Sequence, residues 1–162
     1  MEVAALHSKR TDFVAPLALL AGLWLALVSF DAYAGNSSAS ESAYFIEGYD
    51  VVSYFRDSGP QPGKTSITTT YQDNILLFST EANRSDFLAN PEIFMPAYNG
   101  YCAYGMVFGM KSKVDPLQYD IVDGRLFLQL DKGTKRRWNR RISRNIRKSE
   151  KAWKKLSASV DD

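Results

Sequence analysis

The sequence contains one cysteine, Cys102, and one histidine, His7, among its 162 residues. A single cysteine excludes an intrachain disulfide, so Cys102 is a buried inert thiol, part of an intermolecular bridge, or a reactive or metal-bound group. His7 lies in an N-terminal segment that we expect to be removed. The remaining domain then lacks a histidine base, which excludes Ser–His and Cys–His catalysis. The sequence therefore favours a non-enzymatic protein over an enzyme.

The N-terminal segment has the pattern of a signal peptide. Lys9 and Arg10 precede an apolar run over residues 14–30, and Ala32-Tyr33-Ala34 follows with small residues at both key positions. We expect cleavage before Gly35 and a periplasmic or secreted protein. An uncleaved N-terminal membrane anchor is the alternative, although the run is slightly shorter than the about 20 residues that span a bilayer. The predicted organisation is a signal peptide at 1–34, a flexible mature N-terminus at 35–43, one domain at 44–156 and a tail at 157–162.

Charge is distributed unevenly along the predicted domain. Residues 41–131 carry six Lys/Arg against twelve Asp/Glu, whereas residues 132–155 carry twelve Lys/Arg against Glu150 alone. Such a basic run is commonly a solvated face. It is also suited to an anionic membrane surface, with Trp138 and Trp153 at the interface, or to nucleic acid, a partner that export disfavours.

Local patterns predict an α+β fold, in which a small antiparallel sheet of hairpins carries packed helices and ends in a long basic C-terminal helix. Asp123-Gly124 is the strongest hairpin signal, and Thr80 and Asp131 are expected to cap helices. No internal repeat is evident. The expected elements are an extended segment at 44–55, strands at 67–71 and 75–79, helices at 81–89 and 101–110, strands at 119–122 and 125–130, and a basic helix with an apolar stripe of Trp138, Ile142, Ile146, Trp153 and Leu156.

An ordered series of landmarks runs through the predicted domain. In this order they resemble the YHS-domain family, in particular its small exported single-domain branch. The landmarks are Gly48-Tyr49-Asp50-Val51-Val52-Ser53-Tyr54-Phe55, Gly63, Leu77-Phe78-Ser79, Asn83-Arg84-Ser85-Asp86-Phe87, Ala89-Asn90-Pro91, Pro96-Ala97-Tyr98-Asn99-Gly100-Tyr101-Cys102-Ala103, Asp115-Pro116, Asp123-Gly124-Arg125-Leu126-Phe127-Leu128, Trp138 and Trp153.

The resemblance implies a compact α+β domain. YHS domains are associated with metal-handling proteins, which implies a metal site. In the exported branch the position matching Cys102 can be selenocysteine, which implies redox or soft-metal chemistry. This chain departs from the family in two ways, because the predicted domain has neither the histidine of the family's name nor the paired cysteines of its metal-handling relatives.

The surroundings of Cys102 suggest a candidate metal site. If residues 101–110 form a helix, Cys102, Met106 and Met110 recur every four residues on one face. A thiolate and two thioethers form a ligand set suited to a soft metal such as copper. Two alternatives stay open at this point. A Cys/Met stripe at helical spacing is commonly part of a core, and a lone thiol can be a redox nucleophile.

Tyrosines surround the same cysteine. Tyr98, Tyr101 and Tyr104 have hydroxyl groups that can line a small ligand pocket, or each can bury its ring and leave its oxygen in water. We add Asp50 to this candidate ligand-binding set because it lies inside the first landmark, although a turn or cap role explains it as well.

These observations lead to three functional hypotheses. The first is an exported accessory protein that binds a soft metal or small ligand near Cys102. The second is a thiol redox protein that uses Cys102, and the third is a non-catalytic module that docks through its basic C-terminal helix.

Overall fold

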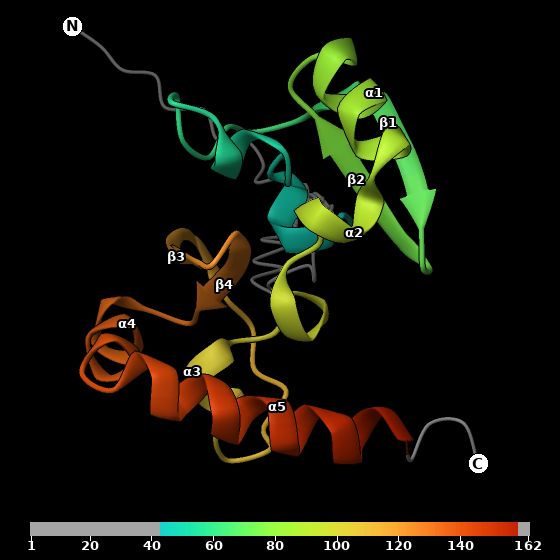
Figure 1. Ribbon diagram of the computed structural model, residues 1–162. Helices are drawn as coiled ribbons and strands as arrows, with labels where there is room; N and C mark the ends of the chain where they lie inside the picture. Colours follow the sequence, from blue (N-terminus) through green and yellow to red (C-terminus); the bar gives the residue numbers. More distant parts are fainter. Residues whose placement is uncertain (1–42, 159–162) are drawn as a thin grey trace, which may run out of the picture. The chain divides into compact units, whose positions relative to one another are not determined.

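Helices pack around two β-hairpins in the fold, which a computed structural model describes over residues 43–158 (Figure 1). The predicted α+β class is confirmed. In chain order the elements are η1 (Phe45–Gly48), η2 (Ser53–Phe55), β1 (Lys64–Tyr71), β2 (Asn74–Phe78), α1 (Glu81–Ala89), α2 (Pro91–Phe94), η3 (Ala97–Gly100), α3 (Ala103–Met106), β3 (Asp115–Val122), β4 (Arg125–Gln129), α4 (Lys132–Asn139) and α5 (Ile142–Ala158).

Both predicted hairpins are present, and they form two separate two-stranded antiparallel sheets. β1 pairs with β2 through the turn Gln72-Asp73, and β3 pairs with β4 through Asp123-Gly124. All four turn residues have positive φ, a geometry that matches the twist of the flanking strands.

Both predicted helix caps are also present. The Thr80 hydroxyl accepts a hydrogen bond from the Asn83 N–H at 3.1 Å, and the Asp131 carboxylate accepts one from the Thr134 N–H at 2.7 Å. Hydrogen bonding from the Thr134 backbone lowers the pKa of Asp131, as expected for a carboxylate that caps a helix. These caps fix where α1 and α4 begin.

The segment predicted to be extended at 44–55 forms tight turns instead. Ile46 and Glu47 have left-handed φ angles of 42° and 57°, and Gly48 follows with φ 81°. Only an isolated bridge between Tyr49 and Pro62 resembles strand pairing here. Aromatic and β-branched residues predicted a strand here. They instead place side chains in the core, where Val51 and Val52 are buried.

The other two predicted helices differ in length from the structure. α3 covers only Ala103–Met106 of the predicted 101–110, because Gly109 adopts φ 72° and turns the chain. The long basic helix is divided into α4 and α5. At the break the Trp138 carbonyl accepts from the Arg141 N–H and from the Asn145 side chain, which interrupts the regular hydrogen-bond ladder.

The two halves of the chain, residues 45–89 and 97–139, repeat one order of elements. Each half starts with a left-handed turn that ends in Gly-Tyr, continues through an eight-residue and a five-residue strand, and ends in a capped helix. The backbone bonds correspond too, since the Asp50 N–H donates to the Gln61 carbonyl at 2.9 Å and the Cys102 N–H to the Ser112 carbonyl at 3.0 Å. The prediction that the chain has no internal repeat is therefore corrected. The repeat lies in the backbone, and few side chains match between the two halves.

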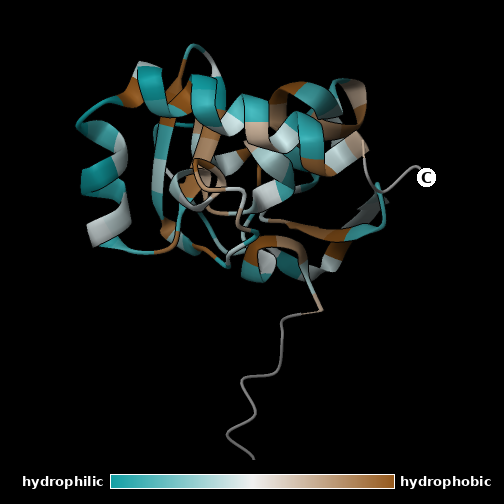
Figure 2. Ribbon diagram, turned by 90° about the horizontal axis from the view of Figure 1, so that it is seen from below, coloured by the Kyte–Doolittle hydropathy of each residue, from teal (hydrophilic) through white to brown (hydrophobic). Residues whose placement is uncertain are grey.

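β4 lies between two hydrophobic clusters. Leu126 and Leu128 belong to the first cluster, whereas Phe127 belongs to the second and packs on Trp138 with 5.3 Å between ring centroids. Because successive strand residues point to opposite faces, one strand supplies both clusters. Hydrophilic and hydrophobic residues alternate along the helices in Figure 2, as expected for helices with one face on a core.

The predicted signal peptide at 1–34 lies outside the described residues, so its cleavage and a periplasmic or secreted location stay predictions. Ser157 and Ala158, which the sequence assigned to a tail, belong to α5. Within residues 43–158, no helix combines the length and apolar character needed to cross a membrane.

Asp50 organises the first half of the chain. Its fully buried carboxylate accepts from the N–H groups of Val52 and Ser79 at 2.9 Å, and from the Ser79 hydroxyl and the Asn83 amide at 2.6 Å. These four donors satisfy the buried charge and join the first turn to the connection between β2 and α1. The geometry matches the turn-and-cap role that the sequence left as an alternative to ligand binding.

We predict that Asp50→Asn lowers the free energy of unfolding by about 2–4 kcal/mol, because an amide replaces an acceptor with a donor facing other donors. Urea denaturation measures this loss. The exposed Asp57→Asn serves as the matched control, with an expected change of about 0.5 kcal/mol or less. Equal stability of the two variants would contradict the anchoring role.

Candidate anion-binding site

Cys102 occupies the place in the second half that Asp50 occupies in the first. Its sulfur accepts from the Leu130 N–H at 3.3 Å, just as the Asp50 carboxylate accepts from the Ser79 N–H. Leu130 directly follows β4, and Ser79 directly follows β2. Each side chain therefore ties the first turn of its half to the end of its hairpin. Cys102 is 1% exposed, which fits a structural thiol.

The Cys102 thiol has further partners in the core. Its sulfur also accepts from the Gly105 N–H at 3.4 Å and donates toward the Gln129 side-chain oxygen at 3.7 Å. The same Gln129 oxygen accepts from the Tyr104 N–H at 3.1 Å. Cys102 and Gln129 together cap the start of α3 and fix it against β4.

The three predicted soft-metal ligands do not share a helix face. Cys102 and Met106 are buried, but Met110 lies beyond the end of α3 and is 53% exposed. Among the described residues, no three His, Cys, Asp or Glu side chains are placed to hold a metal ion. Metal binding and redox chemistry at Cys102 stay predictions, while the observed contacts give this residue a structural role.

The structure separates the three tyrosines predicted to surround Cys102. Tyr98 is 3% exposed and packs between Phe127 and Trp153, and its burial raises its pKa well above the usual range. Tyr101 is half-buried and contacts the Trp153 ring. Tyr98 and Tyr104 line two different hollows.

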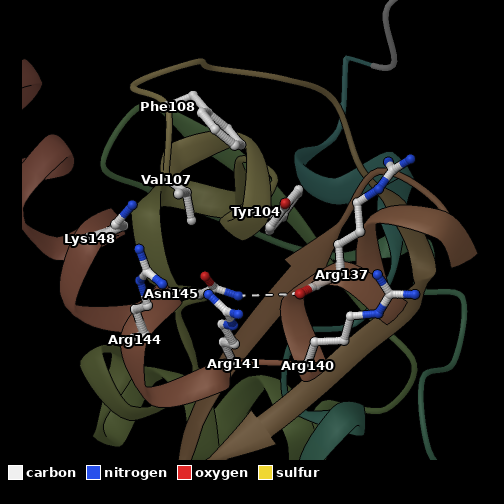
Figure 3. Close-up of a pocket in the computed structure, with 9 residues that line it drawn as sticks. All are labelled: Tyr104, Val107, Phe108, Arg137, Arg140, Arg141, Arg144, Asn145 and Lys148. Carbon is white, nitrogen blue, oxygen red and sulfur yellow. Dashed lines mark hydrogen bonds between the residues drawn. The ribbon is translucent and has the colours of Figure 1, made fainter.

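The Tyr104 hollow, of about 430 Å³, lies between α3, with its following turn, and the α4–α5 pair (Figure 3). Tyr104, Val107 and Phe108 form one wall, which is aromatic and apolar. In Figure 3 long basic side chains from the two helices and the break between them form the facing wall. We call this site the arginine hollow, and its lining from α4, α5 and the break between them consists of Arg137, Arg140, Arg141, Arg144, Asn145 and Lys148.

Buried polar contacts hold the two walls in place. The Ser149 hydroxyl donates to the Ala103 carbonyl at 2.9 Å, which joins α5 to the first turn of α3. The Asn145 amide donates to the Trp138 carbonyl at 2.9 Å, which joins α5 to α4. Asn145 and Ser149 are the two buried residues of α5. Their i, i+4 spacing places them on one face.

The cations of the arginine hollow repel one another. Arg144 and Lys148 are four residues apart within α5, a spacing at which like charges destabilise a helix by about 0.2–0.5 kcal/mol per pair. Arg140 and Arg141 lie in the break between α4 and α5.

No carboxylate within residues 43–158 forms a salt bridge with the hollow's arginines or Lys148. Other cations do form salt bridges with residues of these helices or next to them. Lys135 of α4 pairs with Asp120, and Arg125 pairs with Glu150 of α5. The hollow thus concentrates positive charge that forms no salt bridge in this part of the chain, although Arg137 adds to the hydrogen bonds from Thr134 in lowering the pKa of Asp131.

The sequence predicted only part of this site. The predicted apolar stripe packs on the domain, since Trp138 and Trp153 belong to the second hydrophobic cluster. The interpretation that places Trp138 at a membrane interface is wrong because this ring is fully buried. The buried polar residues Gln129, Asn145 and Ser149 were missed. The available signal was the pair Asn145 and Ser149, whose helical spacing interrupts the apolar stripe.

No protein-family model, curated protein or solved structure matches the chain. The resemblance to the YHS-domain family therefore stays a prediction. Function has to be argued from the chemistry of the site, since a fold alone does not determine it.

The structural role of Cys102 predicts a slow thiol. In the native protein we expect iodoacetamide to alkylate Cys102 at least about 100-fold more slowly than in the urea-unfolded chain, because the sulfur is buried and hydrogen-bonded. Mass spectrometry follows the reaction. Alkylation at similar rates in both states would show an accessible thiol and would support the redox hypothesis instead.

Proposed function

We propose that this domain is a non-catalytic binding module that holds a phosphate-type anion in the arginine hollow. The observation that carries the proposal is the convergence of four arginines and one lysine on one hollow, without a salt bridge to any carboxylate among the described residues. A bound anion would relieve the repulsion among these cations. The proposal thus explains why like charges are concentrated on α4, α5 and the break between them.

The residue types favour phosphate over a single carboxylate. A guanidinium group presents a planar fork of donors that matches phosphate oxygens, and arginine is more weakly hydrated than lysine. Five cations suit a ligand with more than one negative charge. Pyrophosphate is therefore the simplest probe of the site.

Binding without catalysis fits the lining of the hollow. Besides the cations, it contains Tyr104, Val107, Phe108 and Asn145. None of these is a thiol, imidazole or carboxylate, the groups that most often serve as nucleophile or general base. The Asn145 amide is already engaged with the Trp138 carbonyl.

The proposal joins two hypotheses drawn from the sequence. It keeps a small ligand close to Cys102, because Tyr104 lies in the helix that Cys102 caps. It also uses the basic helices as the binding surface, as the docking hypothesis expected. A metal plays no part in this arrangement.

We predict that Arg141→Gln combined with Arg144→Gln weakens pyrophosphate binding by at least about tenfold, because two charge-assisted hydrogen-bond donors are lost. Isothermal titration calorimetry at constant ionic strength measures the dissociation constant. Both side chains are exposed, so the variant is expected to fold normally.

The matched control is Arg147→Gln with Lys154→Gln, which removes the same charge from α5 outside the arginine hollow. We expect it to retain affinity within about twofold, since screened surface charges contribute little. Equal weakening in both double variants would show a general charge effect and would contradict a defined site.

A further inference from the structure

An exposed apolar tip borders the arginine hollow. Phe108 is 63% exposed and Met110 is 53% exposed, and both lie in the turn that follows α3. The Phe108 ring contacts Tyr104 edge-on, with 5.5 Å between centroids. Figure 3 shows Phe108 at the edge of the hollow, on the wall that faces the basic side chains. We call residues 107–110 the apolar tip.

The corresponding turn in the first half of the chain has a polar residue in place of Phe108. In the first half, Gly59 has φ 67° and its N–H donates to the Arg56 carbonyl at 3.0 Å. In the second half, Gly109 has φ 72° and its N–H donates to the Met106 carbonyl at 3.0 Å. When the two turns are matched at these glycines, the exposed Ser58 corresponds to Phe108. The same turn is thus built with a hydroxyl in one half and a phenyl ring in the other.

Basic side chains flank the apolar tip on two sides. A second hollow, of about 490 Å³, is lined by Val107, Phe108 and Gly109 together with Lys148, Lys151 and Lys155 of α5. Phe108 and Lys148 line both hollows. The tip therefore lies between an arginine-rich hollow and a lysine-rich hollow.

We infer that the apolar tip inserts into an anionic lipid bilayer while the flanking cations bind lipid phosphates, an inference that rests on the proposed function of the arginine hollow. Exposed aromatic and apolar side chains beside Lys and Arg are the combination by which peripheral proteins bind such a surface. An anionic bilayer presents lipid phosphate groups for the cations directly beside the hydrocarbon that the apolar side chains enter. Trp138 and Trp153 take no part, because both pack against the domain core.

The test compares three probes on the full chain, namely lipid vesicles, inorganic pyrophosphate and a single-stranded oligonucleotide. Vesicles of phosphatidylcholine with and without phosphatidylglycerol report bilayer binding by sedimentation, and inorganic pyrophosphate reports occupation of the arginine hollow by calorimetry. The variant is Phe108→Ser with Met110→Ser, which leaves every hollow cation in place. Ile93→Ser, which removes another exposed apolar side chain, on α2, is the matched control.

We expect the wild type and the Ile93→Ser control to bind the anionic vesicles and not the neutral ones. The double variant is expected to lose at least about tenfold in vesicle affinity, because two apolar side chains no longer leave water, and to bind pyrophosphate as the wild type does.

Each contrary result has a distinct meaning. Unchanged vesicle binding by the double variant would overturn insertion of the tip. If the wild type binds pyrophosphate but not anionic vesicles, bilayer binding is overturned and the proposed function stays intact. If it binds a single-stranded oligonucleotide but not the vesicles, the surface is assigned to nucleic acid. Absence of binding to all three probes would overturn both proposals.

Discussion

A buried side chain in each half of the chain accepts hydrogen bonds from backbone groups that would otherwise be unpaired in the core. Asp50 does this for the N–H groups of Val52 and Ser79, and Cys102 does it for those of Gly105 and Leu130. Buried backbone N–H groups are costly to leave without partners, so these two acceptors determine where each turn meets its hairpin. A carboxylate and a thiol differ chemically, yet they solve the same structural problem at corresponding positions.

The arginine hollow depends on this arrangement. Cys102 and Gln129 fix α3 against β4, and Ser149 and Asn145 then fix α5 against α3 and α4. Once the walls are held by buried polar contacts, the exposed faces of α4 and α5 are free to carry like charges. The stability of the core therefore supports a surface whose own electrostatics are unfavourable.

Features set by local chemistry could be predicted from the sequence, whereas features set by distant contacts could not. The turn Asp123-Gly124 and the caps Thr80 and Asp131 were predicted, because their geometry depends on neighbouring residues. The tight turns at 44–55 and the early end of α3 were not, because they follow from partners far along the chain and from glycine conformations. The basic run was evident, but the hollow required knowing that α3 faces it.

The central claim is that the four arginines of the hollow act as one anion site, and side-chain NMR tests it most directly. Pyrophosphate titration into the nitrogen-15-labelled protein should shift the Nε–Hε resonances of Arg137, Arg140, Arg141 and Arg144 together and to saturation. The resonances of Arg56 and Arg84, which are paired with Asp86 and Glu81, should stay in place. Small, linear shifts shared by all arginines would contradict the account, because they would show screening of surface charge in place of a defined site.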